Sequence, residues 1–141
     1  MILPTIQTGL ANLIMTALFS LNLQTATTPA VITVSPETPT TTQQSIIQDK
    51  IRETFGDDQT PTAIARCESG FMQFKNGTTT RGLINSHDIG VFQINEIYHA
   101  DDARKLGFNI YEADGNIAYA KYLYDTQGSK PWAWSKDCWA K

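Results

Sequence analysis

The first segment that can do chemistry is the run Arg66-Cys67-Glu68-Ser69-Gly70-Phe71. We expect Glu68 to lie in the last turn of a short buried helix, where the helix dipole disfavours a negative charge. A carboxyl group buried beside apolar and aromatic side chains has a raised pKa, so it can donate a proton near neutral pH. Glycosidic cleavage needs such a donor for the leaving oxygen. Taken alone, Glu68 also fits an acid that only caps a helix end or forms an ion pair there.

Two further segments carry side chains suited to binding a sugar. In the run Asp88-Ile89-Gly90-Val91-Phe92-Gln93-Ile94-Asn95, an alternating strand would place Gln93 and Asn95 on one face. Their amides can bind sugar hydroxyls. In the C-terminal tail, Trp132 and Trp134 can offer aromatic faces to sugar rings, although core packing is the alternative for either tryptophan.

The chain has two cysteines, Cys67 and Cys138. In an exported protein an isolated pair forms a disulfide more often than a metal site, because tetrahedral zinc needs more ligands nearby. We therefore expect a bridge between them, with two separate thiols as the alternative. Closing a loop of about 70 residues would stabilise so small a domain by roughly 4 kcal/mol.

The elements that must position these residues are mostly helical. Apolar spacing predicts helices over 45–55, 60–69, 101–106 and 114–126, the second with Thr60 as its N-cap and Pro61 in its first turn. Short segments over 72–75, 80–85 and 91–95, with a turn at Asn76-Gly77, indicate a small antiparallel sheet. Pro131 begins a final aromatic segment. The expected fold class is α+β and predominantly α.

Composition divides the chain into two parts. The first 48 residues contain no Lys or Arg and one acid, Glu37, whereas the remainder holds 11 basic and 13 acidic residues, a net charge of −2. This balance offers no positive field for phosphates and argues against nucleic acid as a partner. The apolar run 10–23 predicts a signal peptide or an N-terminal apolar anchor over 1–26, with cleavage near Ala26. A Thr/Pro-rich spacer over 27–44 then leads to a domain over 45–141.

Taken together, the three segments resemble the lysozyme-like superfamily over about residues 46–139. Glu-Ser-Gly-Phe resembles the end of the catalytic helix in soluble lytic transglycosylases and goose-type lysozymes. Asp-x-Gly-x-Phe-Gln-Ile-Asn resembles the sheet motif of c-type lysozymes, and its Gly-x-x-Gln part is similar to the transglycosylase motif. The tail resembles the Trp-x-x-Trp segment of c-type lysozymes, whose following cysteine is bridged to the catalytic helix.

The resemblance implies a lysozyme-like fold that cleaves the β-1,4 bond between N-acetylmuramic acid and N-acetylglucosamine in peptidoglycan. Glu68 would act as the acid and then as the base, and Asp88 as an electrostatic stabiliser or nucleophile. The alternatives are a lytic transglycosylase that forms 1,6-anhydro-muramyl ends and a non-catalytic glycan-binding module. The transglycosylase motif Ala-Tyr-Asn-x-Gly has its nearest counterpart at 118–122, which makes Tyr119 a further candidate for substrate binding.

The expected partner is the glycan strand of peptidoglycan, bound by a monomer that is secreted or associated with the cell envelope. The N-terminal segment is a candidate membrane tether. No cofactor and no metal are expected. His87, Glu96 and His99 are spaced unlike a zinc motif, so we interpret them as polar residues that flank the strand.

Overall fold

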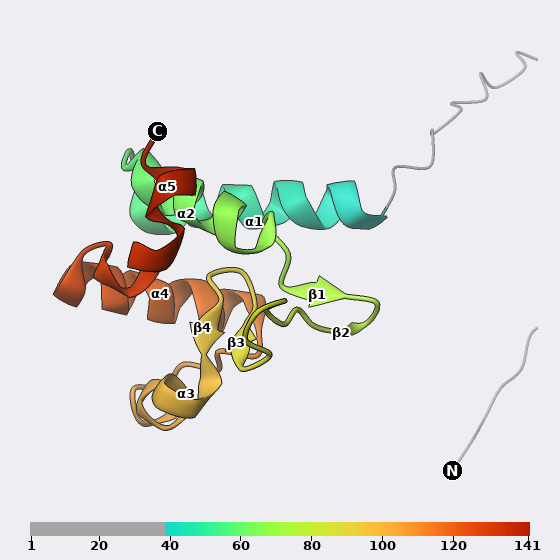
Figure 1. The fold of residues 1–141 in the computed structure, drawn as a ribbon. Helices are drawn as coiled ribbons and strands as arrows, with labels where there is room; N and C mark the ends of the chain where they lie inside the picture. The colour runs from blue at the N-terminus through green and yellow to red at the C-terminus, as the bar shows by residue number, and fades with distance from the viewer. Residues whose placement is uncertain (1–38) are drawn as a thin grey trace, which may run out of the picture. The chain divides into compact units, whose positions relative to one another are not determined.

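The computed structural model describes residues 39–141 of the chain (Figure 1). The predicted signal peptide or anchor over 1–26, and the part of the predicted spacer up to residue 38, lie outside the described residues. The elements, in chain order, are α1 (Pro39–Phe55), α2 (Gln59–Ser69), β1 (Phe74–Lys75), β2 (Thr78–Thr79), β3 (Asp88–Ile89), β4 (Ile94–Asn95), α3 (Glu96–Lys105), α4 (Ala113–Gln127), the 3₁₀ helix η1 (Lys130–Ser135) and α5 (Lys136–Trp139).

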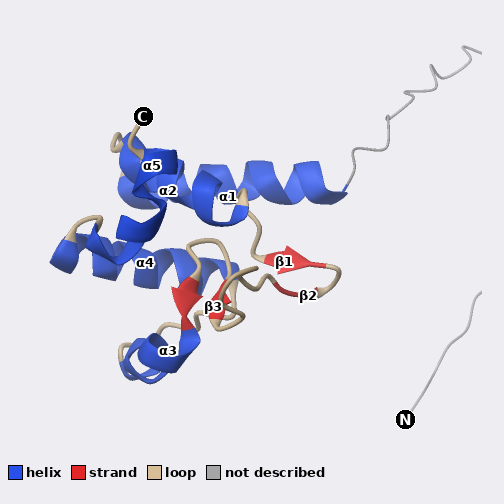
Figure 2. Cartoon of the chain, in the orientation of Figure 1, coloured by secondary structure: helices blue, strands red, loops and turns tan. Residues whose placement is uncertain are grey.

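This part of the chain is mostly helical, with short antiparallel strands (Figure 2). The class predicted from the sequence, α+β and predominantly α, is confirmed at that level. Helix α1 packs against α4 and α2, and the C-terminal η1 and α5 pack against α2. Within residues 39–141, no helix is both long enough and apolar enough to cross a membrane.

Helix α1 begins six residues before the predicted start at residue 45. Its buried face carries Ile47 and Ile51, as the spacing predicted, and it ends at Gly56, which has a φ of +66°. The extra residues at its start include Gln43 and Gln44, whose amides hydrogen-bond to the backbone of 70–74. These contacts join segments about 30 residues apart, so local composition could not reveal that the predicted spacer ends in a helix.

Helix α2 is capped by Asp58, and the predicted cap at Thr60 is wrong. The Asp58 carboxylate accepts the backbone N–H of Thr60 at 2.9 Å, which satisfies one of the free donors at the helix start. Both residues are good caps by type, so only the backbone geometry decides between them. The predicted end of this helix is confirmed: Gly70 adopts a left-handed conformation and its N–H binds the Arg66 carbonyl at 3.1 Å.

The strands form two hairpins. In the first, β1 pairs with β2 across the turn Asn76-Gly77, where both residues have positive φ, as a tight hairpin turn requires. In the second, β3 pairs with β4 in the register Asp88↔Asn95. The predicted strand over 91–95 is only 94–95, because the backbone N–H of Gln93 turns back to the Gly90 carbonyl.

Of the two later helices, α4 agrees closely with its predicted bounds and α3 does not. Helix α4 lies within one residue of the prediction at either end and stops at Gly128. Helix α3 starts five residues before the predicted 101, because the Asn95 side chain caps it by accepting the N–H of Ile97 at 3.1 Å.

The hydrophobic core joins α1, α2, α4, the second hairpin and η1 into one cluster. Its buried members are Ile47, Ile51, Ile64, Ala65, Phe71, Ile89, Val91, Phe92, Ile94, Ala103, Ile110, Ile117, Tyr119, Ala120, Leu123 and Trp132.

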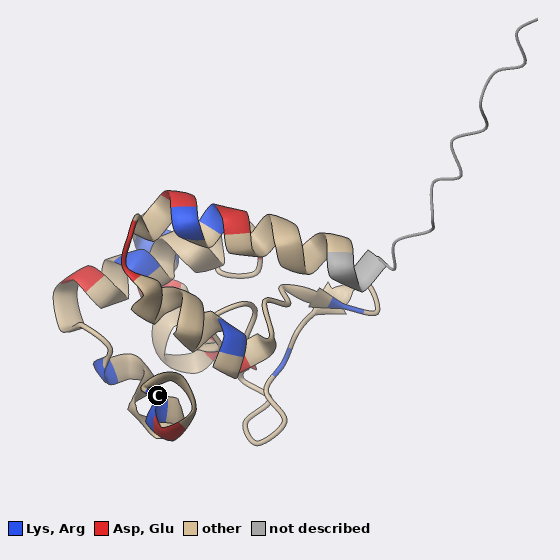
Figure 3. Cartoon of the chain, turned by 90° about the horizontal axis from the view of Figure 1, so that it is seen from above, with Lys and Arg blue, Asp and Glu red and all other residues tan. Residues whose placement is uncertain are grey.

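Charged side chains of both signs are interspersed along the helices (Figure 3). Several pair within one helix, such as Asp101 with Arg104 and Lys121 with Asp125. Pairs of this exposed kind contribute little to stability.

Candidate functional site

A cleft of about 760 Å³ opens beside the end of α2. It combines amide and hydroxyl groups with apolar surface and has one acid and one cation on its walls. The lining residues are Gln43, Gln44, Glu68, Ser69, Met72, Phe74, Lys75, Asn76, Gly77, Thr80 and Leu83. A cleft of this size with a few polar groups is typical of a ligand site.

Glu68 is the acid of this cleft. It lies in the last turn of α2, as the sequence predicted, and it is half-buried. Burial raises the pKa of Glu68, a hydrogen bond from Ser135 opposes the rise, and the nearby charge of Asp88 adds to it. The Ser135 hydroxyl donates to Glu68 Oε1 at 2.5 Å. The outcome is a carboxyl group that holds its proton to higher pH than a free glutamate does.

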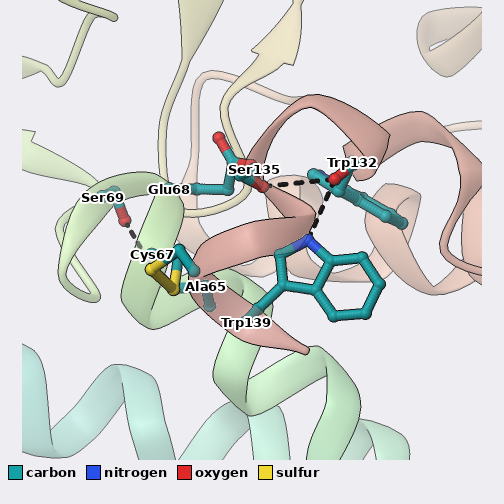
Figure 4. Close-up of a disulfide and its surroundings, with 8 residues drawn as sticks. Ala65, Cys67, Glu68, Ser69, Trp132, Ser135 and Trp139 are labelled. Carbon is teal, nitrogen blue, oxygen red and sulfur yellow. Dashed lines mark hydrogen bonds between the residues drawn. A yellow bond between two sulfur atoms is a disulfide. The ribbon is translucent and has the colours of Figure 1, made fainter. Parts of the chain in front are cut away.

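A disulfide lies directly beside this acid (Figure 4). Cys67, which precedes Glu68, is bridged to Cys138 with a Cα–Cα distance of 6.1 Å, so the predicted pairing is confirmed. The bridge joins α2 to α5 and thereby holds Glu68 and Ser135 next to each other. A disulfide is compatible with an oxidising, extracellular location.

Asp88 lies on β3 and is half-buried, outside the set of residues that line the cleft. Its Oδ1 accepts the side-chain N–H groups of Asn95 at 2.7 Å and of Asn85 at 3.2 Å. Its negative charge is close enough to raise the pKa of Glu68. Two amide donors therefore hold Asp88 in place, and its charge acts on Glu68 from outside the cleft lining.

Two buried amides position the loop between β3 and β4, and the sequence analysis missed both. Gln73 Oε1 accepts the N–H of Val91 at 3.0 Å, and Asn116 Oδ1 accepts the N–H of Phe92 at 3.0 Å. Each of the two side chains is 0% exposed. Backbone groups inside a protein must find partners, and here side chains supply them in place of strand pairing. The sequence did contain a signal for Asn116: this polar residue occupies the apolar stripe of its helix, one turn before Tyr119 and Ala120.

The same loop is tied to α2 and to the C-terminal tail. The Ser69 hydroxyl donates to the Val91 carbonyl at 2.8 Å, and the indole N–H of Trp132 donates to the Phe92 carbonyl at 2.9 Å. Ser69 and Trp132 thus fix how the end of α2 faces the second hairpin.

The amides predicted to face the substrate make contacts within the protein. Gln93 is half-buried in the turn, with a φ of +48°, and its side-chain N–H binds the Gly90 carbonyl at 2.8 Å. Asn95 caps α3 and binds Asp88. Neither lines the cleft, whereas Gln43, Gln44 and Asn76 do.

The predicted aromatic residues occupy three different environments. Trp132 lies in the core with 5% of its surface exposed, whereas Trp134 is fully exposed. Tyr119 is buried on α4, and its hydroxyl lies 3.1 Å from His99 Nδ1, beside a separate small cleft. The structure therefore does not bring Tyr119 to Glu68.

His87 contacts Glu96, whereas His99 hydrogen-bonds to Tyr119, so the three side chains do not form one cluster. Glu96 binds Arg81, His87 and the hydroxyl of Tyr111, and the Arg81 hydrogen bond is the main reason that the pKa of Glu96 falls to about 2. Throughout residues 39–141, no group of three or more His, Cys, Asp or Glu side chains is placed to hold a metal ion.

We expect Gly90→Ala to destabilise the protein by about 2–5 kcal/mol. Gly90 has a φ of +73°, and a Cβ there would lie 2.4 Å from Gln73 Oε1 and 2.5 Å from Asn116 Nδ2. The left-handed backbone costs about 1–2 kcal/mol and the overlap about 1–3 kcal/mol more. Urea denaturation measures the change in the free energy of unfolding.

Gly77→Ala is the matched control for that substitution. Gly77 has a φ of +77° but nothing within 4 Å of the added Cβ, so only the backbone cost applies. Equal losses in the two variants would show that the buried amides do not enforce glycine at position 90.

Comparison of the chain with protein-family models, curated protein sequences and solved structures found no match.

Proposed function

We propose that this protein is a peptidoglycan-cleaving glycosidase with a lysozyme-like catalytic domain and Glu68 as its general acid and base. The bond cleaved is the β-1,4 link between N-acetylmuramic acid and N-acetylglucosamine. The observation that carries the proposal is a half-buried carboxyl group with a raised pKa on the wall of an open cleft rich in amides and hydroxyls. The motif resemblance of the three sequence segments supplies the substrate class.

The chemistry follows from the state of Glu68. A carboxyl group whose pKa is raised holds its proton to higher pH and can pass it to the glycosidic oxygen as the bond from that oxygen to C1 breaks. The bonding electron pair leaves with the oxygen, and positive charge develops at C1. The carboxylate that results then takes a proton from the hydroxyl group that attacks C1.

The walls of the cleft suit a chain of acetylated sugars. The exposed Asn76 offers its amide to hydroxyl and acetamido groups, while Phe74 and Leu83 offer apolar surface to the faces of sugar rings. Leu83 is fully exposed and Phe74 is 37% exposed, which leaves both open to a ligand. The mixture resembles the usual composition of a ligand pocket, in which a few polar groups orient a substrate held by apolar contact.

The placement of Asp88 favours a second outcome of the same reaction. Its Oδ1 is engaged by two amide donors and the residue lies outside the cleft lining, an arrangement that suits charge stabilisation better than nucleophilic attack. Without a protein nucleophile, the substrate's own N-acetyl group can stabilise C1. The C6 hydroxyl of the muramic acid can then attack in place of water, as in a lytic transglycosylase.

Mass spectrometry of products from purified cell-wall sacculi tests the proposal. Reducing muramyl ends would indicate hydrolysis, and 1,6-anhydro ends would indicate transglycosylation. Glycan binding without any released fragment would contradict enzymatic activity and identify a binding module.

A further inference from the structure

Ser135 lies on η1, 67 residues after Glu68, and its hydroxyl has two acceptors within reach. Glu68 Oε1 is 2.5 Å away, and the Trp132 carbonyl oxygen is 3.2 Å away. A serine hydroxyl has a single proton to donate, so it can serve only one of them fully.

The geometry favours Glu68 as the acceptor of that proton. Hydrogen bonds from a hydroxyl to an oxygen acceptor are about 2.5–3.0 Å long, a range that includes the Glu68 contact but not the longer Trp132 contact. In addition, the Trp132 carbonyl already accepts the indole N–H of Trp139 at 2.9 Å (Figure 4). Nothing further is needed to satisfy that carbonyl.

The tail is built to keep this contact. Trp139 anchors the turn that carries Ser135, and Cys138, three residues after Ser135, is bridged to the residue before Glu68. Both partners of the hydrogen bond are thus held beside the same disulfide.

We infer that Ser135 is a positioning residue for Glu68: its hydroxyl occupies Oε1 and leaves Oε2 as the oxygen that carries the proton to the substrate. The inference rests on the proposed function. In a neutral carboxyl group, one oxygen accepts hydrogen bonds and the other bears the proton. A donor held on Oε1 therefore makes Oε1 the carbonyl oxygen, and the acidic proton resides on Oε2.

The same contact serves the second half of the reaction. When Oε2 gives its proton to the glycosidic oxygen, Glu68 becomes a carboxylate and the Ser135 hydrogen bond becomes charge-assisted. Oε2 remains free to take the next proton from the attacking hydroxyl. Since Ser135 does not line the cleft, it acts through Glu68 and not through the substrate.

The test is Ser135→Ala, with kinetics on sacculi and a ¹³C NMR titration of the glutamate carboxyls. The Glu68 resonance is assigned by its absence in Glu68→Gln. We expect kcat to fall on the order of tenfold, a part of what a general acid supplies, with KM little changed. Losing a donor that favours the charged form moves the Glu68 titration and the alkaline limb of the rate profile to higher pH.

Further variants separate this role from a structural one. Ser135→Thr and Ser135→Val have the same shape but differ in the hydroxyl, so they decide the question even if the alanine variant folds poorly. Only the threonine variant should restore the wild-type titration and kcat. Ser129→Ala, at the start of η1 where the serine side chain makes no capping bond, should behave as wild type.

The outcomes distinguish the inference from the proposed function. An unshifted Glu68 titration in Ser135→Ala would overturn the inference, and the function would stand if sacculi are still cleaved. Absence of cleavage by the wild type would overturn the proposed function, and the catalytic role of Ser135 with it.

Discussion

Glu68→Gln is expected to reduce the cleavage of peptidoglycan by about 10²-fold to 10⁴-fold, the contribution that a general acid and base makes. Glutamine keeps the shape of the side chain and can still accept the Ser135 hydroxyl, but it has no proton to give to the leaving oxygen. The rate at which sacculi release soluble fragments measures the loss. Glu53→Gln, which neutralises an exposed acid on α1, is the matched control and should leave the rate unchanged.

The stability of the same variant provides an independent check on the site. The folded-state pKa of Glu68 is raised, mainly by burial, so its favourable contribution is complete below the unfolded-state pKa. That contribution is lost as the pH rises through the folded-state pKa. At neutral pH, Glu68→Gln should therefore unfold no more easily than the wild type, and its stability should lack this pH dependence. Cleavage of sacculi by Glu68→Gln at the wild-type rate would rule out Glu68 as the acid.

Removing the disulfide is expected to lower the free energy of unfolding by about 4 kcal/mol. The bridge joins residues 71 positions apart, and the entropy that such a loop would regain in the unfolded chain sets the size of the loss. For a folded region of about 100 residues this corresponds to a fall in Tm on the order of 15 °C or more. Thermal and urea denaturation of Cys67→Ala/Cys138→Ala measures both quantities.

A reductant supplies the control for that experiment. It should lower the stability of the wild type to that of the double variant and have no effect on the double variant itself. Cleavage of sacculi should fall as well, because the bridge holds the Ser135 segment beside Glu68. A double variant as stable as the wild type would show that core packing alone holds the tail in place.

Local sequence signals predicted the features that depend on neighbours in the chain. Gly70 ends α2 and thereby places Glu68 in the last helical turn. The apolar spacing and Gly128 defined α4 to within one residue, and Asn76-Gly77 identified the first hairpin turn. In each case the backbone conformation follows from the residue's own allowed φ and ψ.

Local sequence signals failed where a segment suited two different structures or offered two possible caps. Asp58 and Thr60 are both good caps, and Asn95 fits a strand face as well as a helix N-cap. An alternating pattern in 91–95 indicated a strand, but side chains from other segments bind the backbone of Val91 and Phe92, and 91–93 form a turn.

The sequence by itself determined an acid at the end of a helix, a pair of cysteines able to bridge, and a mostly helical class with short antiparallel strands. Only the tertiary structure decided which groups surround that acid. Ser135 contacts Glu68, Trp132 enters the core while Trp134 stays exposed, and Gln43 and Gln44 join the cleft. The physical reason is that burial, hydrogen-bond partners and pKa depend on residues distant in the chain, which no local pattern brings together.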